Sequence, residues 1–285
     1  MDEIATTQVV VDKPANTRIL AKEATREKPQ SQVLKKIVSA VLLVAFWLLL
    51  WQLAYKLSGK EEYQFTPPLP VLETLWEGLR DGTFINGVAA SMARVLYGYG
   101  ISLVMGIVIG MLLVSSGFFN WAFGPLVLGV QSLPSICWLP VAILAFGLKD
   151  RAILFVVIMG SVGSVAIATR DGLNQVPVTY QRVASTFGAS LPQRLLWVSI
   201  PAALPAFISG LKQGWSFSWR SLLAGELLYS TVGVGKLLTE ARDLADYPKL
   251  FAMMILVVLI SVLVDKVLFS RLEERIRVRW GLGGK

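Results

Sequence analysis

The chain has 285 residues, of which 54% are apolar and only 16% are charged, and its formal net charge is +8. This composition is too apolar and too poor in charge for a soluble domain of this length, so it predicts an all-α, polytopic membrane protein. With no histidine and one cysteine, Cys137, the chain lacks the commonest general base and metal ligand and cannot form an intrachain disulfide. We therefore expect no enzyme, no metal site and no cofactor bound by this chain.

The N-terminal segment, residues 1–35, is polar and basic and shows no apolar periodicity. It cannot bury enough apolar surface to order itself, which predicts a disordered tail. It also lacks the features of a secretory signal, which favours a cytoplasmic location. Nucleic-acid binding is the alternative for a basic tail, but we expect no nucleic-acid partner because carboxylates dilute the positive charge.

An apolar run of membrane-spanning length covers residues 36–56 and begins next to Lys35. It predicts a first transmembrane helix that enters from the cytoplasm and contacts membrane lipid. Residues 57–92 follow, and their prolines at 67, 68 and 70 forbid a continuous helix. The amphipathic pattern after these prolines predicts a segment lying along the outer membrane interface.

Residues 93–270 are predicted to form a core of five further transmembrane helices. The second span carries Gly106 and Gly110, a spacing that permits close helix contact but is also ordinary in membrane helices. Pro134 and Pro140 interrupt the third span, which favours a kinked helix lining a translocation pathway. The third to sixth spans are predicted at residues 121–146, 151–168, 201–227 and 249–268.

Six spans that start inside bring both termini, the C-terminal tail of residues 271–285 and the loop of residues 170–200 to one side. Lysine and arginine gather on that side in the two tails, whereas the opposite segments are richer in carboxylates. The positive-inside rule therefore places the loop in the cytoplasm.

The loop of residues 170–200 is a polar interruption between two strongly apolar blocks. Four apolar residues recur in it at helical spacing and predict a short helix with one apolar stripe: Tyr180, Val183, Ala184 and Phe187. Gly188 is placed to end this helix in a left-handed cap, and Ser190 with Pro192 can begin a second one. The expected unit is helix, glycine turn, helix.

This loop resembles the signature loop of the membrane subunits of bacterial ABC importers, in which Ala-Ala, three residues, glycine and nine residues precede Ile-x-Leu-Pro. The positions that match this spacing are Val183, Ala184, Gly188, Val198, Ile200 and Pro201. Arg182 stands where the family has an acidic residue. The flanking stretches LPSICWLPVAILAFG and PAALPAFISGLKQGWSFSWRSLLAGELL resemble the nitrate/sulfonate/taurine-type permeases.

The resemblance implies a permease subunit of an ATP-binding-cassette importer, acting as a homodimer with ABC ATPase subunits and an extracytoplasmic solute-binding protein. It also implies that the apolar stripe, Gly188 and Pro201 couple the permease to the ATPase. ATP and Mg²⁺ would be used by the partner, because the nearest match to a phosphate-binding loop, at residues 233–236, lacks the required spacing and reads as a plain connector. A helix resting on lipid is the alternative for the loop helix.

The predicted fifth span contains two cations, Lys212 and Arg220, and charges inside a membrane are functional candidates. Ser216 shares their helix face and Gln213 lies beside it. This cationic stripe could draw an anion along a pathway. A structural alternative stays open, in which one cation pairs with a carboxylate such as Glu226 or Arg220 snorkels to the surface. Asp265 is interpreted as a boundary feature of the sixth span.

The favoured function is ATP-driven uptake of a small anionic solute, such as nitrate, bicarbonate, a sulfonate or taurine. In the implied mechanism, closure of the ATPases moves the loop helices, which tilt the spans. An ion-coupled secondary transporter is the alternative, but it would favour inverted repeats and carboxylates within spans. A membrane scaffold would need neither the cationic stripe nor the proline-broken third span.

Overall fold

The computed structural model describes three stretches of the chain: residues 29–59, 65–229 and 232–279. Every regular element in these stretches is a helix. The chain divides into two units, residues 1–60 and residues 61–285, and each is described by itself. The predicted disordered tail lies outside the described residues as far as position 28.

The first unit contains one helix, α2, which covers Pro29–Ser58. Its stretch Ile37–Ser58 is long and apolar enough to cross a membrane, in agreement with the predicted first span. Apolar side chains surround this stretch, as expected of a helix whose solvent is lipid. The helix begins inside the predicted tail because proline is favoured in a first helical turn, where its missing amide costs no hydrogen bond.

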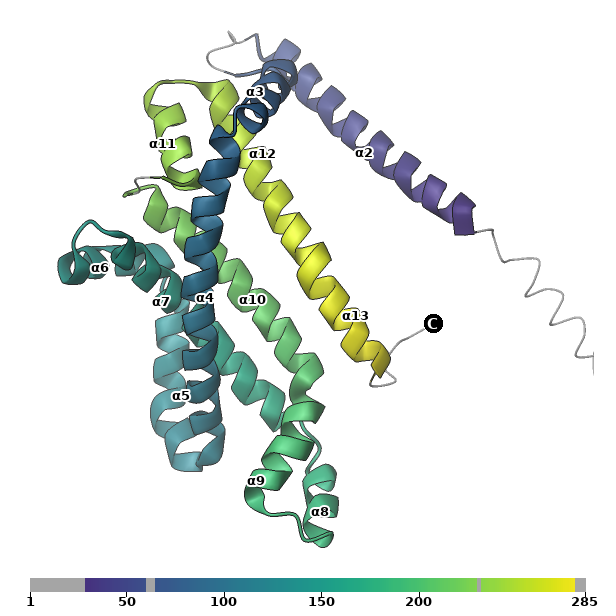
Figure 1. Ribbon diagram of the computed structural model, residues 1–285, viewed down its shortest axis with the longest axis vertical. Helices are drawn as coiled ribbons and strands as arrows, with labels where there is room; N and C mark the ends of the chain where they lie inside the picture. The colour runs from purple at the N-terminus through teal and green to yellow at the C-terminus, as the bar shows by residue number, and fades with distance from the viewer. Residues whose placement is uncertain (1–28, 60–64, 230–231, 280–285) are drawn as a thin grey trace, which may run out of the picture. The chain divides into compact units, whose positions relative to one another are not determined.

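The second unit is a bundle of helices (Figure 1). Its elements in chain order are α3 Pro68–Arg80, α4 Thr83–Ser115, α5 Gly117–Ser132, η1 Ser135–Trp138, α6 Leu139–Phe146, α7 Asp150–Asn174, α8 Val178–Thr186, α9 Leu191–Arg194, η2 Leu195–Ser199, α10 Ile200–Glu226, α11 Val234–Asp243, α12 Tyr247–Val264, η3 Asp265–Phe269 and α13 Ser270–Arg279. Of these, η1 is a 3₁₀ turn, and η2 and η3 are π-helical turns. Figure 1 places α8 and α9 at one end of this unit and α3 and α11 at the other.

Among the described residues, five helices are long and apolar enough to cross a membrane, and a bent pair makes a sixth crossing if it counts as one span. The predicted all-α, polytopic architecture is confirmed. α7 is the central helix: 61% of its most apolar window is buried, against 33% for α4 and 22% for α10. Both neighbours pack along it.

Small residues allow α4 and α7 to approach closely. A Cβ atom added at Gly110 would lie 2.5 Å from the carbonyl oxygen of Ala166, and one added at Gly106 would lie 2.9 Å from that of Val162. Either atom would push the two backbones apart. The glycine pair is therefore a packing face, one of the two interpretations that the sequence left open.

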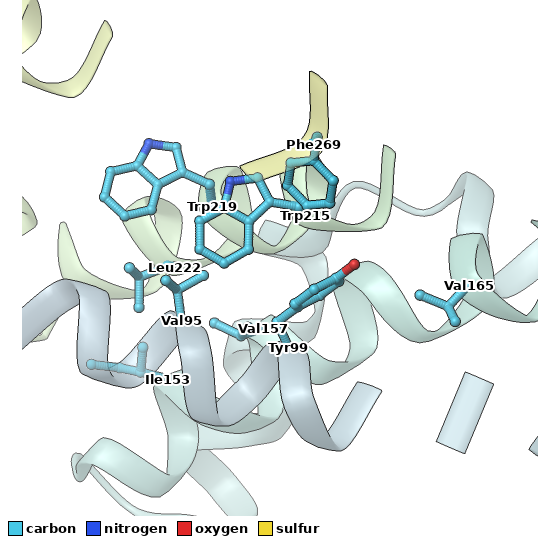
Figure 2. Packing of buried hydrophobic residues seen from close by; sticks show 9 residues of the cluster. All are labelled: Val95, Tyr99, Ile153, Val157, Val165, Trp215, Trp219, Leu222 and Phe269. Carbon is cyan, nitrogen blue, oxygen red and sulfur yellow. The ribbon is translucent and has the colours of Figure 1, made fainter. Parts of the chain in front are cut away.

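An aromatic cluster joins α4, α7, α10 and η3 (Figure 2). The ring centroids of Tyr99 and Trp215 are 5.5 Å apart with an edge-on geometry, and Trp215 also packs on Phe269 at 6.3 Å. The Tyr99 hydroxyl donates a hydrogen bond of 2.7 Å to the Leu211 carbonyl oxygen, so its polar end is satisfied within the bundle. With Trp219 buried beside Trp215, one face of α10 is committed to the core.

The predicted third span is not one kinked helix. The chain breaks at residues 133–134, and α5 and the η1–α6 segment meet at 100°. Pro134 stands just before η1 and ends the helical hydrogen bonding there. Pro140 causes no further kink, because it lies in the first turn of α6, where its missing amide has no helical partner to lose.

Several helices extend beyond the predicted spans. α4 begins at Thr83 rather than near residue 93, α7 continues to Asn174, and the sixth span runs through η3 into α13. Hydropathy marks the part of a helix that lies in lipid, whereas the helix itself continues through polar residues until a cap or glycine ends it. The predicted outer segment of residues 57–92 therefore contains the start of the second span.

Candidate functional site

The loop between α7 and α10 forms the predicted helix, with a glycine cap at its end. α8 ends in a Schellman motif: the amide of Gly188 donates to the Ser185 carbonyl at 3.0 Å, and the amide of Ala189 donates to the Ala184 carbonyl at 3.1 Å. Gly188 has φ +77°, a left-handed conformation that side chains other than glycine adopt at a cost. The predicted left-handed cap is confirmed.

The second predicted helix is not separate from the fifth span. Gln193 caps α9 by accepting hydrogen bonds from the amide and the hydroxyl of Ser190, at 2.8 and 3.0 Å. α9, the π turn η2 and α10 then follow without a break, and a single span covers Pro192–Glu226. Pro201 lies half-buried in the first turn of α10, where proline is tolerated, so it does not interrupt this rod.

The apolar stripe of α8 is open to its surroundings. Tyr180, Val183 and Phe187 are exposed, Phe187 by 84%, while Ala184 is half-buried. Sequence reasoning missed two further exposed apolar residues, Leu196 and Trp197, on the π turn η2 that packs against α8. The sequence feature that could have revealed them is a pair of bulky apolar residues in the otherwise polar loop just before Pro201. We call Tyr180, Val183, Phe187, Leu196 and Trp197 the coupling surface.

The coupling surface is linked to the fifth span in two ways. Its residues on η2 run directly into α10, and α8 packs against η2. The side chain of Gln181 on α8 donates a hydrogen bond of 3.5 Å to the hydroxyl of Ser199, the last residue of η2. Ser199 is itself buried. α8 is thus linked to the base of α10 through η2.

The four polar residues predicted on the fifth span share the less buried face of α10. Gln213 and Arg220 are exposed and Lys212 and Ser216 are half-buried, and the buried tryptophans lie on the adjoining side of the helix. We call Lys212, Gln213, Ser216 and Arg220 the cationic face. Aromatic packing fixes the rotation of α10 and keeps these side chains out of the core of this chain.

The two cations of this face differ in their partners. Nζ of Lys212 lies 2.6 Å from Oδ1 of Asp265 on η3, so Lys212 does pair with a carboxylate, as the structural alternative expected, but the partner is Asp265 and not Glu226. Asp265 is therefore more than a boundary feature of the sixth span. Arg220 has no carboxylate within 4.0 Å among the described residues, and its guanidinium lies 5.8 Å from the ring centroid of Phe217.

The broken third span contacts α10 through η1. A Cβ atom added at Gly160 of α7 would approach both Ser135 on η1 and Ser221 on α10, so these three residues lie close together. Pro134 thus helps to place η1 near Ser221 of α10, the residue that follows Arg220 in the sequence. Pro140 lies in α6, which packs against α7 and η1.

A buried ion pair that the sequence did not predict lies at the C-terminal end of α10. Glu226 has no exposed side-chain surface, and its carboxylate receives hydrogen bonds from Arg94 at 2.8 Å, Ser91 at 2.7 Å and the amide of Gly235 at 3.0 Å. Arg94 also reaches Asp150 at the start of α7, at 3.2 Å. The cluster fastens α4, α7 and α10 together.

The segment of residues 232–235 completes this cluster and is more than a plain connector. The Ser91 hydroxyl accepts a hydrogen bond of 2.8 Å from the amide of Val234. A Cβ atom at Gly235 would lie 2.3 Å from Cβ of Glu226, so glycine is required there. The sequence does show a charged residue near one end of each of two predicted spans, and it shows this glycine-rich turn. No spacing rule relates these features, so the cluster could not be predicted.

Comparison with known proteins identifies the family. Residues 102–278 match the family described as binding-protein-dependent transport system inner membrane component. The chain belongs to this family. The resemblance drawn from the signature loop is confirmed, and the secondary-transporter alternative is not favoured.

Named relatives of this permease come from several bacteria. A nitrate import permease protein, NrtB, of Synechocystis sp. is 28% identical over 81% of this chain and 86% of its own length. The putative aliphatic sulfonates transport permease protein SsuC of Bacillus subtilis is 26% identical over 90% of this chain and 92% of its own length. The permease is an ABC importer subunit of the nitrate/sulfonate/taurine type.

A solved structure shows the same fold. The MetNI methionine ABC transporter in an inward-facing conformation aligns with a TM-score of 0.61 and 17% identity, over 67% of this chain and 95% of the other chain. Because the identity is low, this likeness concerns the fold alone.

Proposed function

We propose that this permease imports a small anion, delivered by an extracytoplasmic binding protein and driven by ATP hydrolysis in separate ABC ATPase subunits. The observation that carries the proposal is the cationic face of α10, with Arg220 exposed and unpaired by carboxylate within the described residues. The names of its relatives point the same way, because they describe permeases for nitrate, bicarbonate, aliphatic sulfonates and taurine.

The cationic face needs a partner other than lipid. A lysine or arginine at the centre of a bilayer costs about 2.5–3.5 kcal/mol on insertion scales. Gln213 and Arg220 stay exposed and Lys212 and Ser216 stay half-buried within this chain, so this face of α10 is left for another contact. A second copy of the permease would enclose the cationic face between two subunits, where it would stay in contact with water and not with lipid. We therefore propose a homodimer with the pathway at its interface.

The broken segment adds polar atoms to this pathway. Oε1 of Gln131 and Nε1 of Trp138 are buried and have no hydrogen-bond partner among the described residues. Such atoms are costly to bury unless water or solute satisfies them. Their position on either side of Pro134 supports the proposal that the break lines the pathway.

Coupling to ATP hydrolysis would pass through the coupling surface. Exposed aromatic and aliphatic side chains at the membrane boundary fit a groove of an ATPase, and the Schellman turn fixes their direction. Since α9, η2 and α10 form one rod, motion of this surface would tilt the cationic face. ATP and Mg²⁺ would be bound by the ATPase and not by this chain. Both termini and this loop would be cytoplasmic.

Reconstitution with a panel of solutes tests the proposal. The permease, its ATPases and its binding protein are placed in proteoliposomes, and uptake of nitrate, bicarbonate, taurine and an alkanesulfonate is compared with that of a neutral solute of similar size. We expect one anion to enter only when ATP and the binding protein are both present. Accumulation driven by an ion gradient without ATP would contradict the proposal.

A further inference from the structure

Two ion pairs in this bundle have opposite surroundings. The Arg94–Glu226 pair is buried, with side chains 11% and 0% exposed, and further hydrogen bonds satisfy both groups. The Lys212–Asp265 pair is open, with side chains 44% and 38% exposed. Among the described residues, neither Lys212 nor Asp265 contacts a second charged group. A pair built only to hold helices together would resemble the first, whereas the second remains accessible from the cationic face.

The position of Asp265 is fixed by the aromatic core. Asp265 opens the π turn η3, and Phe269 at its other end is buried against Trp215 of α10. π turns within helices are rare and occur often at functional sites. η3 is therefore held against α10 by a buried ring contact, while the carboxylate at its open end faces Lys212.

The two cations form a sequence along α10. At about 1.5 Å per residue, Arg220 lies roughly 9 Å and Lys212 roughly 21 Å from Glu226, which is at the outer end. An anion entering from outside meets Arg220 first, and it reaches Lys212 after about 12 Å. Of these two cations, Lys212 alone has a carboxylate partner among the described residues, so its charge is already neutralised.

We infer that Asp265 is a tethered counter-ion within the translocation pathway. Its carboxylate pairs with Lys212 until an incoming anion takes its place. Arg220 is the outer anion site and Lys212 the inner one, and the solute competes with the carboxylate for the lysine ammonium. This inference rests on the proposed function, because it requires α10 to line the pathway.

The exchange has a clear physical basis. Lys212 bears three N–H donors, and the single contact to Oδ1 leaves donors that can bind an anion before the carboxylate leaves. Asp265 is partly exposed, so its carboxylate can turn into water when displaced. The pair keeps the inner site neutral when no solute is present, which avoids an uncompensated charge within the span.

Equilibrium binding of nitrate to the assembled permease–ATPase complex, without ATP and without binding protein, tests the inference. Asp265→Asn removes the competing carboxylate and keeps Lys212, so we expect about tenfold tighter nitrate binding. Asp243→Asn makes the same change on the outer side, where Asp243 pairs with the exposed Arg242, and should leave the affinity unchanged. An unchanged affinity in the Asp265→Asn complex would overturn the inference.

A second variant covers the case in which the Asp265→Asn permease, with Lys212 unpaired, does not assemble with its ATPases. Lys212→Met/Asp265→Asn leaves no charge unpaired and should assemble, but it removes the inner site. We expect it to bind nitrate less tightly than wild type and to lose about tenfold of ATP-driven uptake. Wild-type uptake by this double variant would show that Lys212 is no anion site. If the wild-type transporter imports none of the anions in the panel, it is the proposed function that fails, and the nitrate-binding comparison still decides the role of Asp265.

Discussion

Nη1 of Arg94 lies 2.8 Å from Oε1 of Glu226, although 131 residues lie between them in the sequence. The pair joins α4 to the end of α10, and its carboxylate also holds the turn before α11. Both side chains are largely buried, at the end of the bundle that carries α3 and α11. Breaking it should loosen that end without touching the coupling surface.

We expect Arg94→Met to lower the free energy of unfolding by about 3–5 kcal/mol, because it leaves the Glu226 carboxylate buried and uncompensated. Thermal unfolding of the purified permease in detergent measures this effect. Arg80→Met is a matched control at an exposed position and should change little. The double variant Arg94→Met/Glu226→Met should recover part of the loss; a double variant less stable than Arg94→Met would contradict the account.

Gly188→Val should abolish transport-linked ATP hydrolysis while the permease still inserts. No atom lies within 4 Å of an added Cβ atom at Gly188, so the damage comes from the left-handed φ and not from a clash. The turn would open, and the coupling surface would change direction. ATPase activity of the assembled transporter, with and without binding protein, is the measurement.

Gly100→Val is the control for that change, since Gly100 is helical and also has no atom within 4 Å of an added Cβ atom. Normal ATP hydrolysis in the Gly188 variant would remove the turn from the coupling mechanism. Ala184→Arg, which adds a charged arm within the stripe of α8, should give the same loss as Gly188→Val for a different reason.

Ala245→Gly should stabilise the permease. α11 ends in a second Schellman motif, in which Ala245 has φ +54° and occupies the position that usually carries glycine. Removing its Cβ atom relieves about 1 kcal/mol of backbone strain. Ala89→Gly on the exposed, helical part of α4 should have the opposite sign, and thermal unfolding of both variants decides whether the two effects differ.

Reporter fusions test the orientation of the permease. Reporters inserted near Gln175 and fused after Lys285, which lies outside the described residues, should score cytoplasmic, and reporters near Gly82 and Asp243 should score external. A reporter at Lys149 should also be external if α5, η1 and α6 together cross the membrane once. A cytoplasmic signal at Lys149 would make this segment re-entrant, and the orientation of α7 and α8 would then be wrong.

Hydropathy and local spacing predicted much of this fold, because spans and caps depend on neighbouring residues. The stripe of α8 and the cap at Gly188 are of this kind. The partners of Lys212 and Glu226 could not be predicted, since each lies on a helix distant in sequence and no spacing rule relates them. The 100° bend before η1 was also missed, because hydropathy carries no information about the direction of the backbone after Pro134.

The central claim is that Arg220 attracts the anion into a pathway along α10. The most direct test is ATP-driven uptake of the transported anion by proteoliposomes that hold equal amounts of assembled transporter, compared for wild type, Arg220→Lys and Arg220→Gln. A hydrogen bond to a charged group contributes about 1.5–3 kcal/mol, so we predict a loss of about tenfold or more for Arg220→Gln and a smaller loss for Arg220→Lys. Intact assembly with undiminished uptake by Arg220→Gln would contradict the account.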